Sequence, residues 1–345
     1  MLESVPFVPS RATRAERERL HAFRRARQLE DAPDDPLSPD EVFEAEWGED
    51  PFRLRHVHMV VDGATAVGWL VASAVAPAAP EHASGGHLLD AEVWVLEPYR
   101  RRGIARGLLA EIVALMDRHR ATVWTTVTAL DSGHAFLGAL GARAVYRSIQ
   151  SRLDLAAVDW DLVERWAAEG RARSPGTRLE LYSPRLPDDR LAEFGAVHTE
   201  LMALVAAGDM DHGDSVYDER RWRAFYARLE PQGGSHHCAL LRDRDGRTVA
   251  MTEMVHRPHA AGFIRQELTA VRPSARGRGL AKWAKAAMLR HVRDAHPDVR
   301  WVVTGNADSN AAMRGINAAL GFRPHREHVV YQMDREALRS LTARP

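Results

Sequence analysis

The feature that most constrains the fold is an internal duplication. The segments PYRRRGIARGLLAEIVALM (98–116) and SARGRGLAKWAKAAMLRHV (274–292) align without a gap, 176 positions apart. Further along, AFLGALGA (135–142) matches GINAALGF (315–322) at nearly the same offset. Solenoid proteins repeat at roughly 20–50 residues. The much longer spacing here predicts two copies of one domain.

Length and composition agree with two globular domains. The chain has 345 residues, of which 45% are hydrophobic and 27% charged, and a domain usually takes about 100–200 residues. The sequence contains no apolar run of about 18 residues, which is the length that predicts a membrane span, so we expect no membrane partner. Acids and bases balance at 47 each, which argues against a nucleic-acid partner. A single cysteine, Cys238, indicates a cytoplasmic location.

The hydrophobic pattern predicts alternating strands and helices in each copy, and therefore an α/β fold with a mixed sheet covered by helices on both faces. A hairpin over 236–256 should turn at Asp245-Gly246, which is a strong turn signal. In the second copy, further strands are predicted at 179–183, 263–271, 301–305 and 328–333, and helices at 187–206, 218–229, 279–294 and 309–320.

The join between the copies should be helical. LAAVDWDLVERWAAEG (155–170) has helical apolar spacing, and the turn-rich RARSPGT (171–177) follows it. We therefore predict an N-terminal domain over 1–154, a helical linker over 155–177 and a C-terminal domain over 178–345.

Each copy carries the same loop between a strand and a helix, Arg-x-x-Gly-x-Ala. A helix N-terminus has unpaired N–H groups and a partial positive charge, and glycines let the backbone approach a phosphate. Cations crowd both helix starts: Arg100, Arg101, Arg102 and Arg106 in the first copy, and Arg276, Arg278, Lys282 and Lys285 in the second. Since cations there oppose the helix dipole, the pattern predicts two anion sites.

These loops, RRRGIA (100–105) and RGRGLA (276–281), resemble the pyrophosphate loop of the GNAT superfamily of N-acetyltransferases. The segment NAAMRGINAALGF (310–322) is similar to a later segment of that family. The resemblance implies two tandem GNAT-like domains, an architecture similar to that of mycothiol synthase, with acetyl-CoA as cosubstrate and no metal.

The resemblance also implies residue roles. The loop N–H groups should hold the pyrophosphate, the end of the preceding strand should pair with the pantetheine arm, and Asn310 should lie beside that arm. The implied cofactor-binding residues are Thr269, Val271, Arg276, Gly277, Arg278, Gly279, Leu280, Ala281, Lys282 and Asn310 in the second copy, and Arg100, Arg102, Gly103 and Ala105 in the first.

The catalytic residues follow the family less closely. Asn317 stands where many GNAT enzymes have a tyrosine that protonates the leaving thiolate, and a carboxamide donates a hydrogen bond without being a general acid. Either Tyr217, Tyr226 or Tyr331 serves instead, or the thiolate leaves without full protonation.

Glu267 is the candidate general base, because strand alternation places it on the face of Thr269 and Val271. The alternative is an exposed Glu in a salt bridge to an arginine. If Glu267 is not the base, Glu253, His256 or a chain of waters would take that role.

The first copy keeps the loop but loses these features. Sequence alignment sets Ala91 opposite Glu267, and Leu130 and Leu137 opposite Asn310 and Asn317. We therefore assign catalysis to the second copy. The first copy either binds acetyl-CoA or only supports the fold, with Asp90 and Glu92 as weak candidates there.

The predicted function is acetyl-CoA-dependent N-acetylation of a small-molecule amine, such as an antibiotic-like compound, an amino sugar or another cationic metabolite, by a monomer or homodimer. A cationic acceptor fits five acids that border the expected pocket: Asp209, Asp211, Asp214, Asp218 and Glu219. The alternatives are a non-catalytic acyl-CoA-binding protein, an acetyltransferase of proteins or peptides, and an aminoacyl-tRNA-dependent transferase.

Overall fold

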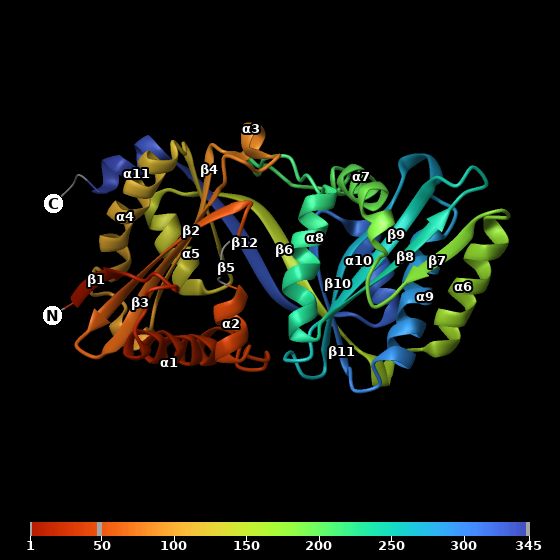
Figure 1. Cartoon of the computed structure of the whole chain (residues 1–345), viewed down its shortest axis with the longest axis horizontal. Helices are drawn as coiled ribbons and strands as arrows, with labels where there is room; N and C mark the ends of the chain where they lie inside the picture. Colours follow the sequence, from red (N-terminus) through yellow and green to blue (C-terminus); the bar gives the residue numbers. More distant parts are fainter. Residues whose placement is uncertain (1, 47–49, 343–345) are drawn as a thin grey trace. The chain divides into compact units, whose positions relative to one another are not determined.

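Both copies of the repeated motif form a strand, a loop and a helix. The structure is a computed structural model that describes residues 2–46 and 50–342 (Figure 1). In the first copy β4 (Leu88–Val95) leads to α4 (Ile104–His119), and in the second β10 (Phe263–Val271) leads to α9 (Leu280–Ala295). Both helices bury an apolar stripe against a sheet, which is the period-3.6 pattern read from the sequence.

The chain divides into two compact units that are not the two contiguous copies. Unit 1 comprises the described residues of 1–147, 207–214 and 328–345, and unit 2 comprises 148–206 and 215–327. The copies exchange segments: the end of each copy completes the sheet of the other unit. The predicted domain ranges 1–154 and 178–345 therefore delimit sequence copies rather than compact units.

Unit 1 has a mixed sheet in the order β1-β2-β3-β4-β5-β12. β4 and β5 run parallel, and the other neighbours in this unit run antiparallel. The later part of β12 pairs with β5, from Val329 opposite Thr128 to Asp334 opposite Val123. The strands not yet given are β1 (Leu2–Pro6), β2 (Arg53–Asp62), β3 (Thr65–Val75), β5 (Val123–Thr128) and β12 (Arg323–Asp334).

Helices cover both faces of this sheet. One core holds Leu20 and Phe23 of α1 against Trp69 of β3, and the other holds the apolar stripe of α4 with Leu338 of α11. The helices are α1 (Arg14–Asp31), α2 (Asp40–Glu46), α3 (His82–Gly85), α5 (Asp131–Leu140) and α11 (Arg335–Thr342), with a 3-10 turn η1 (Glu97–Tyr99).

Unit 2 has the equivalent sheet in the order β6-β11-β10-β9-β8-β7. β10 and β11 run parallel, and β6 pairs antiparallel with β11, from Asp154 opposite Trp301 to Ser148 opposite Ala307. The predicted hairpin is confirmed, with Gly246 at a φ of +80° between its strands. The strands are β6 (Arg143–Asp154), β7 (Arg178–Tyr182), β8 (Ser235–Arg242), β9 (Thr248–His256) and β11 (Trp301–Ala307).

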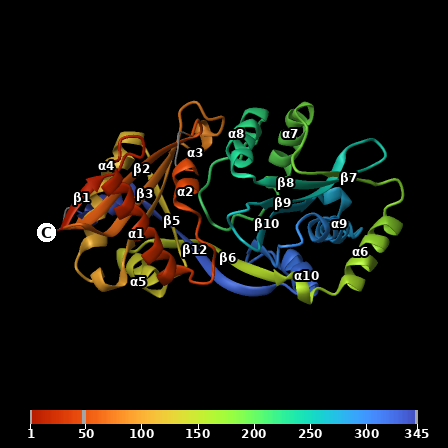
Figure 2. The same cartoon turned by 60° about the horizontal axis from the view of Figure 1, so that its bottom comes forward.

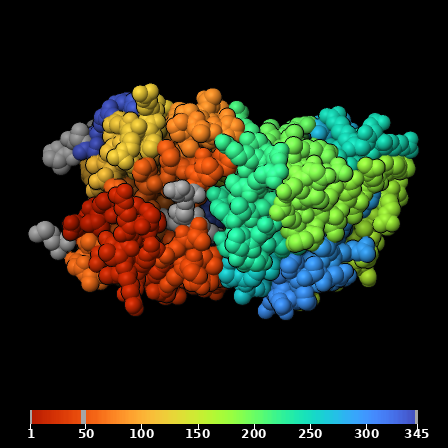
Figure 3. Space-filling view, viewed as in Figure 1, coloured from red at the N-terminus to blue at the C-terminus, as the bar shows by residue number. Residues whose placement is uncertain are grey.

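In unit 2, α7 and α8 lie on one face of the sheet, and α9 and α6 on the other (Figure 2). The segment that carries α7 and α8 covers much of the unit in the space-filling view (Figure 3). The helices are α6 (Trp160–Arg173), α7 (Leu191–Met202), α8 (Glu219–Leu229) and α10 (Ala311–Leu320), with 3-10 turns η2 (Leu155–Ala157), η3 (Asp188–Arg190), η4 (Glu230–Gln232) and η5 (Pro273–Ala275).

Two sequence expectations in this region need correction. The helix predicted over 187–206 is shorter, because residues 188–190 form a 3-10 turn after Pro187. The acidic segment is divided between the two units, because Asp209, Asp211 and Asp214 belong to unit 1. There the Asp211 carboxylate lies 3.0 Å from His87 Nε2. Asp218 caps α8 by accepting from the Arg221 N–H.

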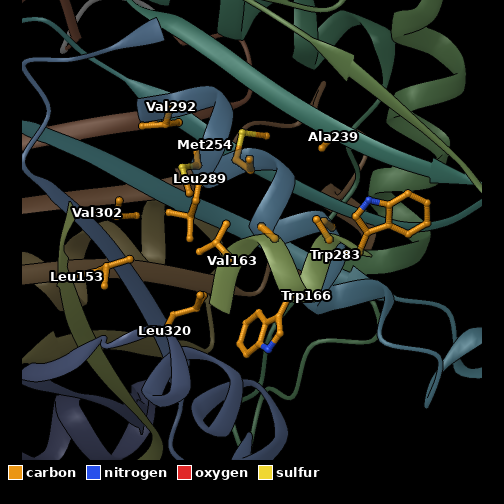
Figure 4. Close-up of a cluster of buried hydrophobic side chains, with 14 of the residues drawn as sticks. Leu153, Val163, Trp166, Ala239, Met254, Trp283, Leu289, Val292, Val302 and Leu320 are labelled. Carbon is orange, nitrogen blue, oxygen red and sulfur yellow. The ribbon is translucent and has the colours of Figure 1, made fainter. Parts of the chain in front are cut away.

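The predicted linker helix, α6, is part of a core. Val163 and Trp166 are buried with Trp283 and Leu289 of α9 and with strand residues such as Met254 (Figure 4). The helices approach closely at Gly170, where an added Cβ would lie 2.5 Å from the Cβ of Trp283. Among the described residues, no helix combines the length and apolar character that crossing a bilayer requires.

We predict that Gly170→Ala lowers the free energy of unfolding by about 1–3 kcal/mol, because the methyl group overpacks the contact with Trp283. Gly315→Ala is the matched control, since Gly315 also lies within a helix but faces open space. That change should stabilise by about 0.5–1 kcal/mol. Urea unfolding measures both, and equal shifts of the two variants would contradict the close approach of α6 and α9.

Candidate functional site

Unit 2 contains a cavity of about 600 Å³ at the end of β10. Its walls come from β10, the loop before α9, the starts of α9 and α10, and the ends of α6 and α7. The lining residues are Arg173, Leu201, Leu204, Val205, Ala206, Thr269, Ala270, Val271, Ala275, Arg276, Gly277, Gly279, Leu280, Ala281, Lys282, Ser309, Asn310, Ala312, Met313 and Ile316.

The loop before α9 exposes backbone donors to this cavity. Gly277 and Gly279 adopt left-handed φ values of +77° and +79°, and α9 has no side-chain cap. Within the described part of the chain, the N–H groups of 277–282 have no backbone acceptor, whereas those of Arg276 and Trp283 do. Because the macrodipole of α9 adds positive potential at this end, the loop has the donors and the potential that suit an anion.

Three cationic side chains line the same cavity. Arg276 donates from Nε to the carbonyl of Val271 (3.4 Å), and among the described residues no carboxylate pairs with it. The Lys282 ammonium lies 4.9 Å from the ring centre of Trp166. Arg173, at the end of α6, was missed by sequence reasoning, although RARSPGT following an amphipathic helix was a signal for a basic helix end.

The predicted cofactor residues of the second copy come together with one exception. Arg278 lies outside the cavity lining and donates to Thr177 Oγ1 (3.4 Å). The apolar wall from the end of α7, including Leu201 and Leu204, was also missed, because nothing in its sequence distinguishes it from an ordinary helix end. The binding roles of these residues stay predictions.

β10 contains a bulge where it reaches the cavity. Gln266 lies opposite Met254 but Thr269 lies opposite Thr252, so β10 has one residue more than β9 between these pairs. β4 of unit 1 pairs one-for-one with β3 through the equivalent stretch. The two copies can be aligned at their parallel pairs, Phe263–Trp301 and Leu88–Val123. In that alignment β10 has one residue more than β4 between the strand start and the loop.

The bulge corrects two inferences about Glu267. Counting from the strand start sets Ala91 opposite Gln266, so Glu267 falls within the bulge and has no simple counterpart in the first copy. Strand alternation also fails there, because Gln266 and Thr269 share a face and their side chains lie 3.3 Å apart. Glu267 is exposed and outside the cavity lining, and its carboxylate accepts from Arg265 Nε (3.1 Å).

The remaining catalytic candidates are mostly buried. Glu253 lies between His198 and His236, at 2.9 and 3.0 Å. Burial alone would raise the pKa of Glu253, but these imidazoles hold it well below its usual range. Tyr226 is buried against His236 (2.8 Å), and burial raises its pKa. Tyr331 lies in unit 1, 3.0 Å from His134.

The two predicted asparagines differ in their access to the cavity. Asn310 lines it and caps α10 through Oδ1, which accepts from the Met313 N–H (3.1 Å). Asn317 is buried outside the lining and donates to Asn306 Oδ1 (2.7 Å). Its own Oδ1 has no partner among the described residues.

Lys285 does not belong to the basic cluster at the start of α9. Its side chain is 1% exposed and points into the core of unit 2. Its ammonium donates to Gln266 Oε1 (3.2 Å) and lies 5.5 Å from the ring centre of Phe322. Burial lowers the pKa of Lys285 to about 7.

Comparison with known protein families finds the same domain twice in the chain. The model of the acetyltransferase (GNAT) family matches residues 19–142 and 202–322. The chain belongs to this family. It is a tandem GNAT protein and an acyltransferase. No curated protein sequence matches the chain, and within the described residues no group of three or more His, Cys, Asp or Glu side chains could hold a metal ion.

Solved structures share the fold over nearly the whole chain. A tandem GNAT protein from the clavulanic acid biosynthesis pathway, in a structure without AcCoA, is 23% identical with a TM-score of 0.72, over 97% of this chain and 99% of that one. A GCN5-related N-acetyltransferase from Sphaerobacter thermophilus is 16% identical with a TM-score of 0.63, over 97% and 96%.

The first GNAT loop has the same conformation as the second but a different neighbour. Arg101 and Gly103 adopt φ values of +63° and +80°, like Gly277 and Gly279. The carboxylate of Glu30, at the end of α1, accepts from Arg100 (2.5 Å) and from the Glu97 N–H (2.8 Å). The guanidinium equivalent to Arg276 is therefore already paired with an anion in unit 1.

A second cavity, of about 540 Å³, lies in unit 1 and is lined by Asp90 and Glu92. Burial raises the pKa of both carboxyl groups, while Arg53 and Arg27 lie 3.4 and 3.7 Å from them. The predicted loop residues Arg100, Arg102, Gly103 and Ala105 line neither of the two cavities described here.

We predict that Lys285→Met gains stability relative to wild type as the pH falls from 10 to 6. Replacing a buried charge by an apolar side chain favours the variant by about 1–4 kcal/mol, and loss of the donor to Gln266 Oε1 offsets about 1–3 kcal/mol of this at every pH. The folded pKa of about 7 lies below the ordinary 10.5, so wild-type stability is lost as pH falls toward 7. The advantage of the variant should therefore shrink between pH 7 and 10. Urea unfolding at pH 6, 8 and 10 measures it, and a difference independent of pH would contradict the buried amine.

Proposed function

We propose that the chain transfers an acetyl group from acetyl-CoA to the amine of a small molecule, and that unit 2 holds the acetyl-CoA. The observation that carries this proposal is the cavity in which the uncapped N-terminus of α9, the end of β10 and the start of α10 converge. Family membership supports acyl transfer in general.

The lining residues fit the parts of acetyl-CoA. The loop N–H groups and the cations Arg276, Lys282 and Arg173 suit a pyrophosphate, since donors and charge converge on one end of the cavity. The strand end at Thr269–Val271 offers backbone groups to an extended amide-containing arm. When bound, acetyl-CoA supplies an activated acyl thioester, and the chain's own residues position it.

Two differences between the units support assigning the reaction to unit 2. The loop arginine of unit 1 is paired with Glu30, whereas Arg276 faces the cavity without a carboxylate partner in the described part of the chain. The bulge is present in β10 and absent from the equivalent stretch of β4. We infer that one chain binds one acetyl-CoA.

Glu267 remains the proposed general base. Glu267 is exposed and precedes the cavity-lining Thr269 by two positions in β10, so it would act on the amine through water. The acceptor is proposed to be the amine of a small molecule.

A second candidate function is binding of acyl-CoA without turnover. It is favoured by one observation: neither Glu267 nor Asn317 lines the cavity. Release of free thiol from acetyl-CoA, measured against a panel of amines, tests the two functions. Thiol release that depends on an amine supports the transferase, and acetyl-CoA binding without any release supports the alternative.

We predict that Gly279→Asp weakens acetyl-CoA binding at least about tenfold, because a carboxylate would enter the anion site and a side chain at a φ of +79° is strained. Gly63→Asp is the matched control, since Gly63 also has a positive φ (+61°) and open space but lies in unit 1. Calorimetry of both variants measures the affinity. Adding Gly103→Asp to the first change tests whether residual binding comes from the loop of unit 1, and unchanged affinity in all three would refute the site.

We predict that Glu267→Gln lowers turnover about 10²–10⁴-fold, as loss of a general base does, while acetyl-CoA affinity stays within about twofold. The deficit should shrink as pH rises, because more of the amine is then neutral. Steady-state kinetics from pH 6.5 to 9.5 measures this, with Arg265→Gln as a control for loss of the Arg265–Glu267 contact alone. Full activity of Glu267→Gln at neutral pH would eliminate Glu267 as the base.

A further inference from the structure

A network of side chains beneath the cavity holds the two ends of the β10 bulge together. The Gln266 amide nitrogen donates to Thr252 Oγ1 (2.8 Å) and to the Glu253 carbonyl (2.8 Å), and lies 3.3 Å from Thr269 Oγ1. The hydroxyls of Thr252 and Thr269 are 2.7 Å apart. Gln266 precedes the bulge and Thr269 follows it, so these contacts fix its span.

Lys285 completes this network from the opposite side. Both hydrogens of the Gln266 amide are directed toward Thr252 and the Glu253 carbonyl, so Gln266 Oε1 needs a donor of its own. The Lys285 ammonium, 3.2 Å away, is that donor. A donor at this position favours one orientation of the carboxamide, because a flipped amide would direct its NH₂ group at the ammonium and its oxygen at the Glu253 carbonyl.

The burial of this lysine is unfavourable for the fold. Within the described residues Lys285 has no ion-pair partner, and its contact with Gln266 is a single hydrogen bond to a neutral group. Burying an ammonium without a counter-charge is unfavourable relative to water, and an apolar side chain of similar length would fill the same space. Packing alone therefore does not explain a lysine here.

The network reaches the cavity through Thr269. Thr269 lines the cavity together with Ala270 and Val271, and its hydroxyl is held by Thr252 and Gln266. A shift of the bulge would move the strand end that lines the cavity. Small displacements matter for chemistry, since misplacement by about 1 Å costs on the order of 10²-fold in rate.

We propose that Lys285 is a positioning residue for acyl transfer, which acts through Gln266 to hold the bulge of β10 and the cavity-lining Thr269 in the reactive arrangement. This inference rests on the proposed function for its kinetic test. It assigns the buried lysine a role in turnover rather than in affinity, because the proposed function has the loop hold the pyrophosphate, whereas Lys285 contacts Gln266 and Phe322.

The kinetic test compares Lys285→Met with Met288→Leu, a buried change on the same face of α9 outside the network. Lys285→Met should lower kcat about 10- to 100-fold, leave the KM for acetyl-CoA within about twofold and unfold at no lower urea concentration than wild type. In a Gln266→Met background the same change should have no further effect on kcat. An unaltered kcat in folded Lys285→Met would overturn the inference.

Hydrogen exchange separates failure of this inference from failure of the proposed function. Without any ligand, amides 267–269 should exchange at least about tenfold faster in Lys285→Met than in Met288→Leu, while the amides of α9 exchange equally in both. If wild type acetylates no amine, the proposed function fails and the exchange data decide alone. Equal exchange at 267–269 in the two variants would then overturn the positioning role.

Discussion

The site in unit 2 depends on the exposed N-terminus of α9. Gly277 and Gly279 turn the chain through left-handed conformations, so that successive N–H groups reach the cavity without backbone acceptors. In unit 1 Arg101 takes the conformation that Gly277 takes in unit 2, which costs a non-glycine residue about 1–2 kcal/mol. Two loops of one shape therefore differ in what faces them: the Glu30 carboxylate in one unit and an open cavity in the other.

A β-bulge distinguishes the two copies at the level of the strand. One additional residue in β10 interrupts the ladder with β9 and changes which side chains face α9. The polar cluster of Gln266, Thr252 and Thr269 lies where a regular strand would present apolar side chains to the core, as Ala91 and Val93 do in unit 1. The strand that reaches the cavity thus differs between the copies, while the loop shape is retained.

The sequence predicted most of the secondary structure and the position of the glycine loop before α9, because glycine turns and apolar periodicity are local signals. The hairpin at Gly246 and the helix after Gly279 are examples. The bulge was missed, because FIRQELTAV keeps an unbroken strand composition and a register slip is decided by the partner strand. Lys285 was misread as part of a surface cluster, although its spacing from Met288, Leu289 and Val292 places it on the buried stripe of α9. The sequence also did not predict that β6 pairs with β11 and β12 with β5, because such pairing depends on tertiary structure.

The exchanged strands also bear on how the protein is made. The sheet of unit 1 is completed by β12, which follows every strand of unit 2 along the chain. During synthesis the first copy therefore emerges with β5 still an open edge, and unpaired edges invite association with other chains. The ribosome must translate past residue 334 before that edge is covered. Closure of unit 1 thus requires residues that are synthesised after all the strands of unit 2, which couples the maturation of the two units.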